Sequence, residues 1–253
     1  MSGPYQKDFY NLIEEGVKNS ARVIVPLLAN QFQPGSVADI GCGTGEWLAQ
    51  FRNNGASTIF GIDGPWVEDR QLAIDPDEFT AMDLSQPLDT SKLPVNRFDL
   101  ALCLEVGEHL DKSCSGLLVR NLTQISSVIL FSAAIPGQGG VDHVNEQWQT
   151  YWAELFAQRN FTAIDWLRPK IWDNAQVDTW YKQNTLLYIS NHRLQEWPAI
   201  AETRPAGGDL IANVVHPAQY MQKLNDTDPS RMSLINTLKK LPRIFKSALK
   251  RRL

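Results

Sequence analysis

The stretch VADIGCGTGEW, residues 37–47, decides the expected fold because an apolar run ends there in three closely spaced glycines. The apolar residues favour a buried strand, and Gly41, Gly43 and Gly45 favour a tight turn that a ligand can approach closely. Backbone amides at the start of the following helix favour polar or anionic groups. A dinucleotide-binding loop has the pattern G-x-G-x-x-G. Here the third glycine comes one residue early and position 46 is glutamate, so this pattern does not fit.

Short β-rich runs alternate with helical stretches after this turn. This alternation predicts an α/β fold with a mostly parallel sheet and helices on both faces. The expected strands are 36–41, 57–63, 79–83, 98–105, 127–134, 161–167 and 184–190. The expected helices are one or two over 8–32 and single helices over 46–55, 116–126 and 146–160, the last with an apolar face of Trp148, Trp152, Leu155 and Phe156.

The length and composition predict one large domain with extensions. The chain has 253 residues, of which 43% are hydrophobic and 21% charged, so it can bury a sizeable core. We divide it into N-terminal helices (1–34), a central domain (35–192) with an aromatic insertion (168–183), an irregular extension (193–230) and a basic amphipathic tail (231–253).

Several classes of protein are not indicated by the sequence. No apolar run reaches the roughly 18–20 residues that a transmembrane helix needs. The first residues lack the basic start and apolar core of a signal peptide. The three cysteines show no disulfide pattern. We therefore expect a cytoplasmic protein with reduced thiols.

The charge is distributed unevenly along the chain. The net charge is −4, but residues 231–253 contain eight Lys and Arg and no acidic residue, which leaves about −12 on the remainder. Such an acidic body argues against nucleic acid as a partner. Two hypotheses cover the tail, namely peripheral contact with an anionic membrane or docking against its own domain or a partner subunit.

The pattern D-x-G-x-G-x-G, which begins at Asp39, resembles motif I of the class I S-adenosylmethionine (SAM)-dependent methyltransferases. The resemblance extends in order over roughly residues 36–135. It implies a Rossmann-like, seven-stranded sheet in the order 3-2-1-4-5-7-6, with SAM as the cofactor. The cofactor would lie across the carboxyl ends of the strands, where the strand order switches.

The resemblance also implies roles for individual residues. Asp63 closes the second strand, where the family holds the two ribose hydroxyls. Met82 would pack on the adenine ring, and Asp83 would accept a hydrogen bond from the adenine amino group. The complete predicted cofactor site is Asp39, Gly41, Cys42, Gly43, Gly45, Asp63, Met82, Asp83, Leu104 and Glu105.

The stretch LEVGEHL, residues 104–110, is similar to the family's fourth-strand motif E-V-x-E-H-L. If the strand turns into a helix here, Glu105, Glu108 and His109 project to one side. His143 would approach from the glycine-rich loop after the fifth strand. Methyl transfer requires an aligned nucleophile about 3 Å from the methyl group and removal of its proton. We therefore predict His143, Glu108 and His109 as catalytic residues.

The same four side chains admit three interpretations. Glu105, Glu108, His109 and His143 could bind a divalent metal, with positions left open for substrate oxygens. This arrangement resembles the metal sites of small-RNA 2′-O-methyltransferases and is similar to the pattern in ubiquinone-pathway O-methyltransferases. Alternatively, His143 or His109 is a general base without metal, or the cluster is structural.

The aromatic residues of the second half suggest where an acceptor binds. Trp148, Tyr151 and Trp152 have the spacing of a helix core. The insertion contains Trp172, Trp180 and Tyr181, and in this family that region commonly covers the acceptor pocket. Aromatic faces among polar residues suit a sugar or polyhydroxylated metabolite.

The sequence therefore predicts an O-methyltransferase acting on a small-molecule or saccharide hydroxyl. The alternatives are an N-methyltransferase of a small amine, an RNA 2′-O-methyltransferase and a SAM-binding regulatory protein.

Overall fold

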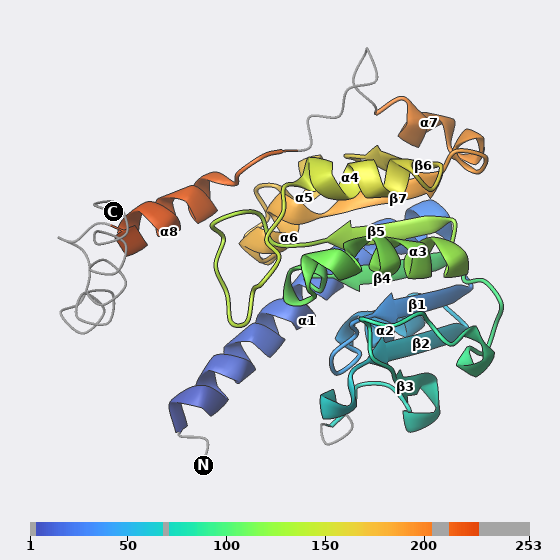
Figure 1. The fold of residues 1–253 in the computed structure, drawn as a ribbon, viewed down its shortest axis with the longest axis horizontal. Helices are drawn as coiled ribbons and strands as arrows, with labels where there is room; N and C mark the ends of the chain where they lie inside the picture. The colour runs from blue at the N-terminus through green and yellow to red at the C-terminus, as the bar shows by residue number, and fades with distance from the viewer. Residues whose placement is uncertain (1–3, 68–70, 204–212, 228–253) are drawn as a thin grey trace. The chain divides into compact units, whose positions relative to one another are not determined.

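The computed structural model describes residues 4–67, 71–203 and 213–227 (Figure 1). The chain consists of two compact units, one ending at Val214 and one starting at Val215. The second contains helix α8 (Pro217–Thr227). The predicted basic tail, 231–253, lies outside the described residues. No helix among the described residues is long and apolar enough to cross a membrane.

The first unit is built on one seven-stranded sheet in the order β3-β2-β1-β4-β5-β7-β6. All neighbouring strands are parallel except β7, which runs antiparallel to both β5 and β6. The predicted α/β class and strand order are therefore confirmed. The strands are β1 (Ser36–Ile40), β2 (Thr58–Asp63), β3 (Phe79–Ala81), β4 (Leu100–Leu104), β5 (Val128–Ser132), β6 (Phe161–Ile164) and β7 (Leu186–Ser190).

Helices cover both faces of the sheet and divide the core into two layers (Figure 1). On one face, α1 (Pro4–Phe32) and α2 (Glu46–Asn53) bury apolar side chains against β1 and β4. On the other, α3 (Ser115–Ile125) and α4 (Gln149–Ala157) pack on β4 and β5. The leading helical region is thus one helix, although Pro26 lies inside it.

Helix α4 shows how spacing determines burial. Trp152 and Phe156, four residues apart, share one face and are almost fully buried. Phe156 stacks on Tyr188 with ring centroids 3.8 Å apart. Trp148 was predicted to share this face, but it directly precedes the helix and is 40% exposed. The chain is still extended at Trp148, so the helical spacing does not apply there.

The segments predicted to be an insertion and an irregular extension contain short helices. The aromatic insertion forms α5 (Arg168–Ile171) and α6 (Thr179–Asn184). The prediction that 193–230 is irregular is wrong for α7 (Pro198–Ala201) and α8. Both helices begin at a proline, which fits a first helical turn because its missing N–H is not needed there.

The sheet brings three connecting segments to one edge. The chain continues from β1 to β2 on one side and reaches β4 on the other, so the strand order switches between β1 and β4. The parallel strands β1, β4 and β5 all end at this edge. The glycine turn, residues 105–109 and the loop after β5 therefore meet where ligands bind in open α/β sheets.

Candidate active site

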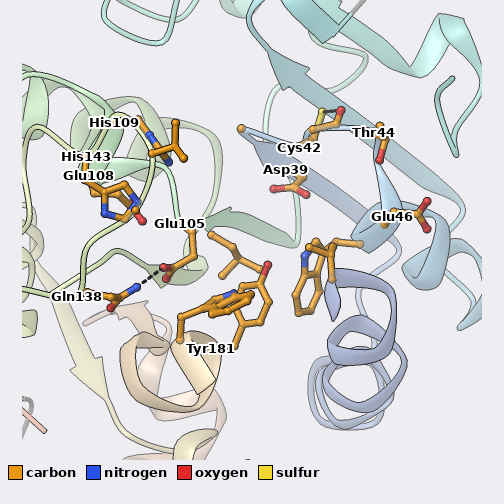
Figure 2. A pocket seen from close by; sticks show the side chains of 18 of the residues that line it. Asp39, Cys42, Thr44, Glu46, Glu105, Glu108, His109, Gln138, His143 and Tyr181 are labelled. Atoms are coloured by element: carbon orange, nitrogen blue, oxygen red, sulfur yellow. Dashed lines mark hydrogen bonds between the residues drawn. The ribbon is translucent and has the colours of Figure 1, made fainter. Parts of the chain in front are cut away.

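A cavity of about 470 Å³ opens at this edge (Figure 2). Its lining comes from the glycine turn after β1, the end of β4, the loop after β5, α1 and α6. All three predicted catalytic residues line it. The predicted residues that line it are Asp39, Gly41, Cys42, Gly43, Leu104, Glu105, Glu108, His109, His143, Trp180 and Tyr181.

The glycine turn has a left-handed backbone. Gly41, Gly43 and Gly45 have φ values of 81°, 52° and 85°, which other residues rarely adopt. A Cβ on Gly41 would lie 2.2 Å from the Val106 side chain, whereas one on Gly43 would meet nothing within 4 Å. Glycine at 41 thus permits close packing, and glycine at 43 leaves bare backbone toward the cavity.

Asp63 stabilises this turn through hydrogen bonds. Its Oδ2 accepts a hydrogen bond of 2.8 Å from the Gly43 amide, and its Oδ1 accepts one of 2.6 Å from Gly64. Asp83 is exposed, and its Oδ1 accepts hydrogen bonds from the amide and hydroxyl of Ser85. Neither acid lines the cavity, and neither Met82 nor Gly45 does. The role of Asp63 toward ribose and the roles of Met82 and Asp83 toward adenine stay predictions.

Asp39 is a buried acid that lines the cavity, with 2% of its surface exposed. Burial, and next the neighbouring charge of Asp63, raise the pKa of the Asp39 carboxyl to about 7. The cost of ionising it is reduced by any ligand that brings positive charge or a hydrogen-bond donor. The cavity is thus suited to a cationic or donor-rich ligand.

Glu105 departs from the predicted geometry. The chain does not continue from β4 into a regular helix, and only Gly107–His109 form a single 3-10 turn. Glu105 itself has a left-handed φ of 57°. Its carboxylate accepts hydrogen bonds from Asn184 Nδ2 at 3.0 and 3.3 Å and from Gln138 Nε2 at 3.2 Å. Burial raises its pKa.

Glu108, His109 and His143 form a tight cluster. One nitrogen or oxygen atom of each lies within 4.8 Å of the others, and the two imidazole rings are 4.9 Å apart and nearly perpendicular. Glu105 is not part of this group, so only three of the four predicted metal ligands lie close together among the described residues, and metal binding stays a prediction. Glu105 lies apart because of its backbone angle and the amide side chains that hold it.

Glu108 is the most unusual member of the cluster. It is fully buried, and among the described residues neither carboxylate oxygen has a hydrogen-bond partner. Burial, and then the charge of Glu105, hold the pKa of Glu108 well above its usual range. Its backbone carbonyl accepts hydrogen bonds from the amides of Val144 and Asn145, which docks the His143 loop.

His109 and His143 differ in their surroundings. Burial, and next the neighbouring His143, lower the pKa of His109, which keeps its ring neutral at physiological pH. The Nδ1 of His143 lies 3.1 Å from Glu146 Oε1. The sequence did not point to Glu146 or Gln138, although an acid three residues after a histidine in a glycine-rich loop is a usable signal.

Some of the predicted aromatic residues line the cavity, and others belong to the apolar core. Trp180 and Tyr181 of α6 line the cavity, and Tyr181 contacts Trp47 with centroids 5.2 Å apart. Trp172 does not line it. Trp152 belongs to the core and packs on Phe131 at 4.9 Å, as its helical spacing predicted.

The model of a methyltransferase domain family matches residues 14–202. This range includes the whole sheet and every residue that lines the cavity. The chain belongs to this methyltransferase family. Its strand order is the Rossmann-like order of the class I SAM-dependent enzymes. A search of curated proteins found no significant match.

Solved methyltransferase structures share the fold at low identity. The chain is 14% identical to a Nostoc punctiforme PCC 73102 protein provisionally assigned as an O-methyltransferase (TM-score 0.51, covering 72% of this chain and 59% of that one). It is 13% identical to an O-methyltransferase family protein from Burkholderia thailandensis (0.50, 72% and 58%). Magnesium protoporphyrin IX methyltransferase from Synechocystis PCC 6803, with bound S-adenosylhomocysteine, is 17% identical (0.50, 76% and 89%).

These likenesses establish the fold of this methyltransferase. The chain spans less than two thirds of the length of the Nostoc and Burkholderia proteins.

Replacing Asp39 by asparagine should stabilise the protein at alkaline pH. The pKa of Asp39 is raised from 3.8 to about 7, so between these values the folded chain holds a proton that the unfolded chain has released. Stability contributed by this group therefore falls as pH rises through that window. The gain from D39N should be small at about pH 4, full above about pH 7, and at most about 4 kcal/mol.

Urea denaturation of both proteins across this pH range measures the gain. D83N is the matched control, because Ser85 lowers the pKa of exposed Asp83 and no alkaline gain should appear. A D39N gain that is as large in acid as in alkali would contradict the assigned cause.

Proposed function

We propose that this protein transfers the methyl group of SAM to a hydroxyl of a small molecule or saccharide. One observation carries the proposal, namely that a single cavity has the glycine turn on one side and the Glu108–His109–His143 cluster on the other (Figure 2). The family's cofactor motif and a group of proton-accepting side chains thus face the same space.

The residues present fit SAM. Gly43 leaves the backbone bare beside open space, and the buried carboxyl of Asp39 favours positively charged ligands. These residues, with Gly41, Cys42 and Leu104, would hold the cofactor. When bound, SAM supplies an electrophilic methyl group on a positively charged sulfur.

The protein's own contribution is to orient the acceptor and remove its proton. A hydroxyl oxygen gains the methyl carbon as the carbon–sulfur bond breaks, and its proton must pass to a base. Nε2 of His143 can accept that proton, because Nδ1 is already bonded to Glu146. His109 stands beside it with a lowered pKa, so it adds no positive charge that would oppose proton transfer.

The charge of the lining supports an acceptor without negative charge. Four carboxylic acids line the cavity, and no Lys or Arg among the described residues does so. Trp180 and Tyr181 add an apolar wall suited to the face of a ring. A neutral, hydroxylated small molecule or sugar meets both conditions. The four acids are Asp39, Glu46, Glu105 and Glu108.

The same cluster also fits a divalent cation, which we propose as a second form of the mechanism. Glu108 offers two carboxylate oxygens that have no hydrogen-bond partner among the described residues, and one nitrogen of each imidazole lies within 4.8 Å of a Glu108 oxygen and of the other imidazole. A bound cation would lower the pKa of the acceptor hydroxyl. Glu108, His109 and His143 would hold it.

His143→Ala should lower turnover far more than it weakens SAM binding. General-base contributions are typically on the order of 100-fold or more, and His143 lies across the cavity from the glycine turn. Turnover is measured as S-adenosylhomocysteine release with an acceptor found by screening hydroxylated compounds, and SAM affinity by calorimetry. His192→Ala, at an exposed histidine outside the cavity, is the matched control. Equal losses in turnover and affinity would show that His143 is not at the reaction centre.

Chelation separates the two forms of the mechanism. If a cation is used, exhaustive dialysis against EDTA should abolish turnover, and calorimetry should detect one divalent site that Glu108→Gln removes. If His143 acts alone, chelated enzyme keeps its turnover. Retained turnover together with no detectable site would eliminate the metal form.

A further inference from the structure

We propose that Glu146 is a positioning residue that fixes the tautomer of His143. Its carboxylate accepts the Nδ1 hydrogen of the ring, so Nε2 is left as the unprotonated nitrogen. The inference rests on the proposed function only in the use made of Nε2, because the tautomer is a property of the protein itself.

The hydrogen-bond inventory of Glu146 supports this assignment. Its Oε2 accepts a bond of 2.7 Å from the Gly137 amide, and its Oε1 accepts one of 2.6 Å from the Gly139 amide. Both carboxyl oxygens thus serve as acceptors, so Nδ1 of His143, 3.1 Å from Oε1, is assigned the hydrogen of this contact.

The bond between His143 and Glu146 is shielded from solvent. The two side chains are only 11% and 20% exposed, so water competes weakly for their bond.

The loop fixes the ring from the other side as well. A Cβ on Gly140 would lie 2.2 Å from Nε2 of His143, so the ring rests against bare backbone. Gly137 and Gly139 have φ values of 83° and 73°, which direct their amides toward Glu146. One carboxylate therefore closes the loop and orients the histidine.

The arrangement has a chemical consequence for the ring. A neutral imidazole has one N–H and one basic nitrogen, and the hydrogen bond at one nitrogen decides the role of the other. Without an acceptor at Nδ1, the ring is free to place its hydrogen on Nε2. A proton on that nitrogen would prevent it from acting as a base or a metal ligand.

Nitrogen-15 NMR of the full-length protein reports the tautomer without any acceptor. The chain has four histidines, and the His143 signals are identified by their loss in His143→Ala. Spectra are recorded in EDTA at alkaline pH, where the ring is neutral. Wild type should show the Nδ1–H pattern for His143. Glu146→Gln should keep it, because the amide oxygen still accepts, and Glu146→Ala should shift it toward Nε2–H.

Kinetic measurements separate positioning from folding. Glu146→Ala should lower turnover by about 10- to 100-fold, the range for residues that orient a reactive histidine, while SAM affinity stays within about 2-fold and Glu146→Gln restores most of the turnover. An Nε2–H pattern in wild type, or an unchanged pattern in Glu146→Ala, would overturn the proposal. Should Glu146→Ala fail to fold, the wild-type spectrum decides. The two proposals can fail separately. If His143 shows the expected tautomer but the protein methylates no hydroxyl, the proposed function is refuted and this inference stands.

Discussion

The contact between Gly41 and Val106 is the constraint on which the site depends. The amides of Gly41 and Cys42 both bond to the Ile62 carbonyl, at 2.7 and 3.2 Å, which turns the chain sharply at the end of β1. Val106 occupies the space that a side chain at 41 would take, and it directly precedes the turn of Glu108 and His109. This contact therefore fixes the distance between the glycine turn and the cluster of Glu108, His109 and His143.

The site contains buried carboxyl groups whose charge and hydrogen bonds are not fully compensated by the rest of the protein. Burial is the largest cause of the raised pKa of Asp39, Glu105 and Glu108. The Glu105 carboxylate is held by amide side chains, whereas the carboxylate oxygens of Glu108 have no hydrogen-bond partner among the described residues. Groups perturbed in this way cluster at functional sites, because ligands and not the protein complete their interactions. The two apolar layers of the core supply the stability that such a site lacks.

Local sequence patterns were enough to predict the strands, and the family resemblance predicted their order. The glycine turn was found because left-handed backbone restricts the choice of residue. The position of Glu105 could not be found in this way, since its partner Asn184 is 79 residues distant and its own φ is unusual for glutamate. Glu146 was missed for a related reason, because its role appears only once the loop has folded onto His143.

A crystal structure of the full-length protein with S-adenosylhomocysteine tests the central claim most directly. We predict that the ligand's sulfur lies inside the cavity, over the glycine turn at Gly43 and facing the cluster of Glu108, His109 and His143. The open space between the sulfur and Nε2 of His143 would then be the place of the acceptor hydroxyl. A ligand whose sulfur lies outside this cavity, or faces away from His143, would contradict the account.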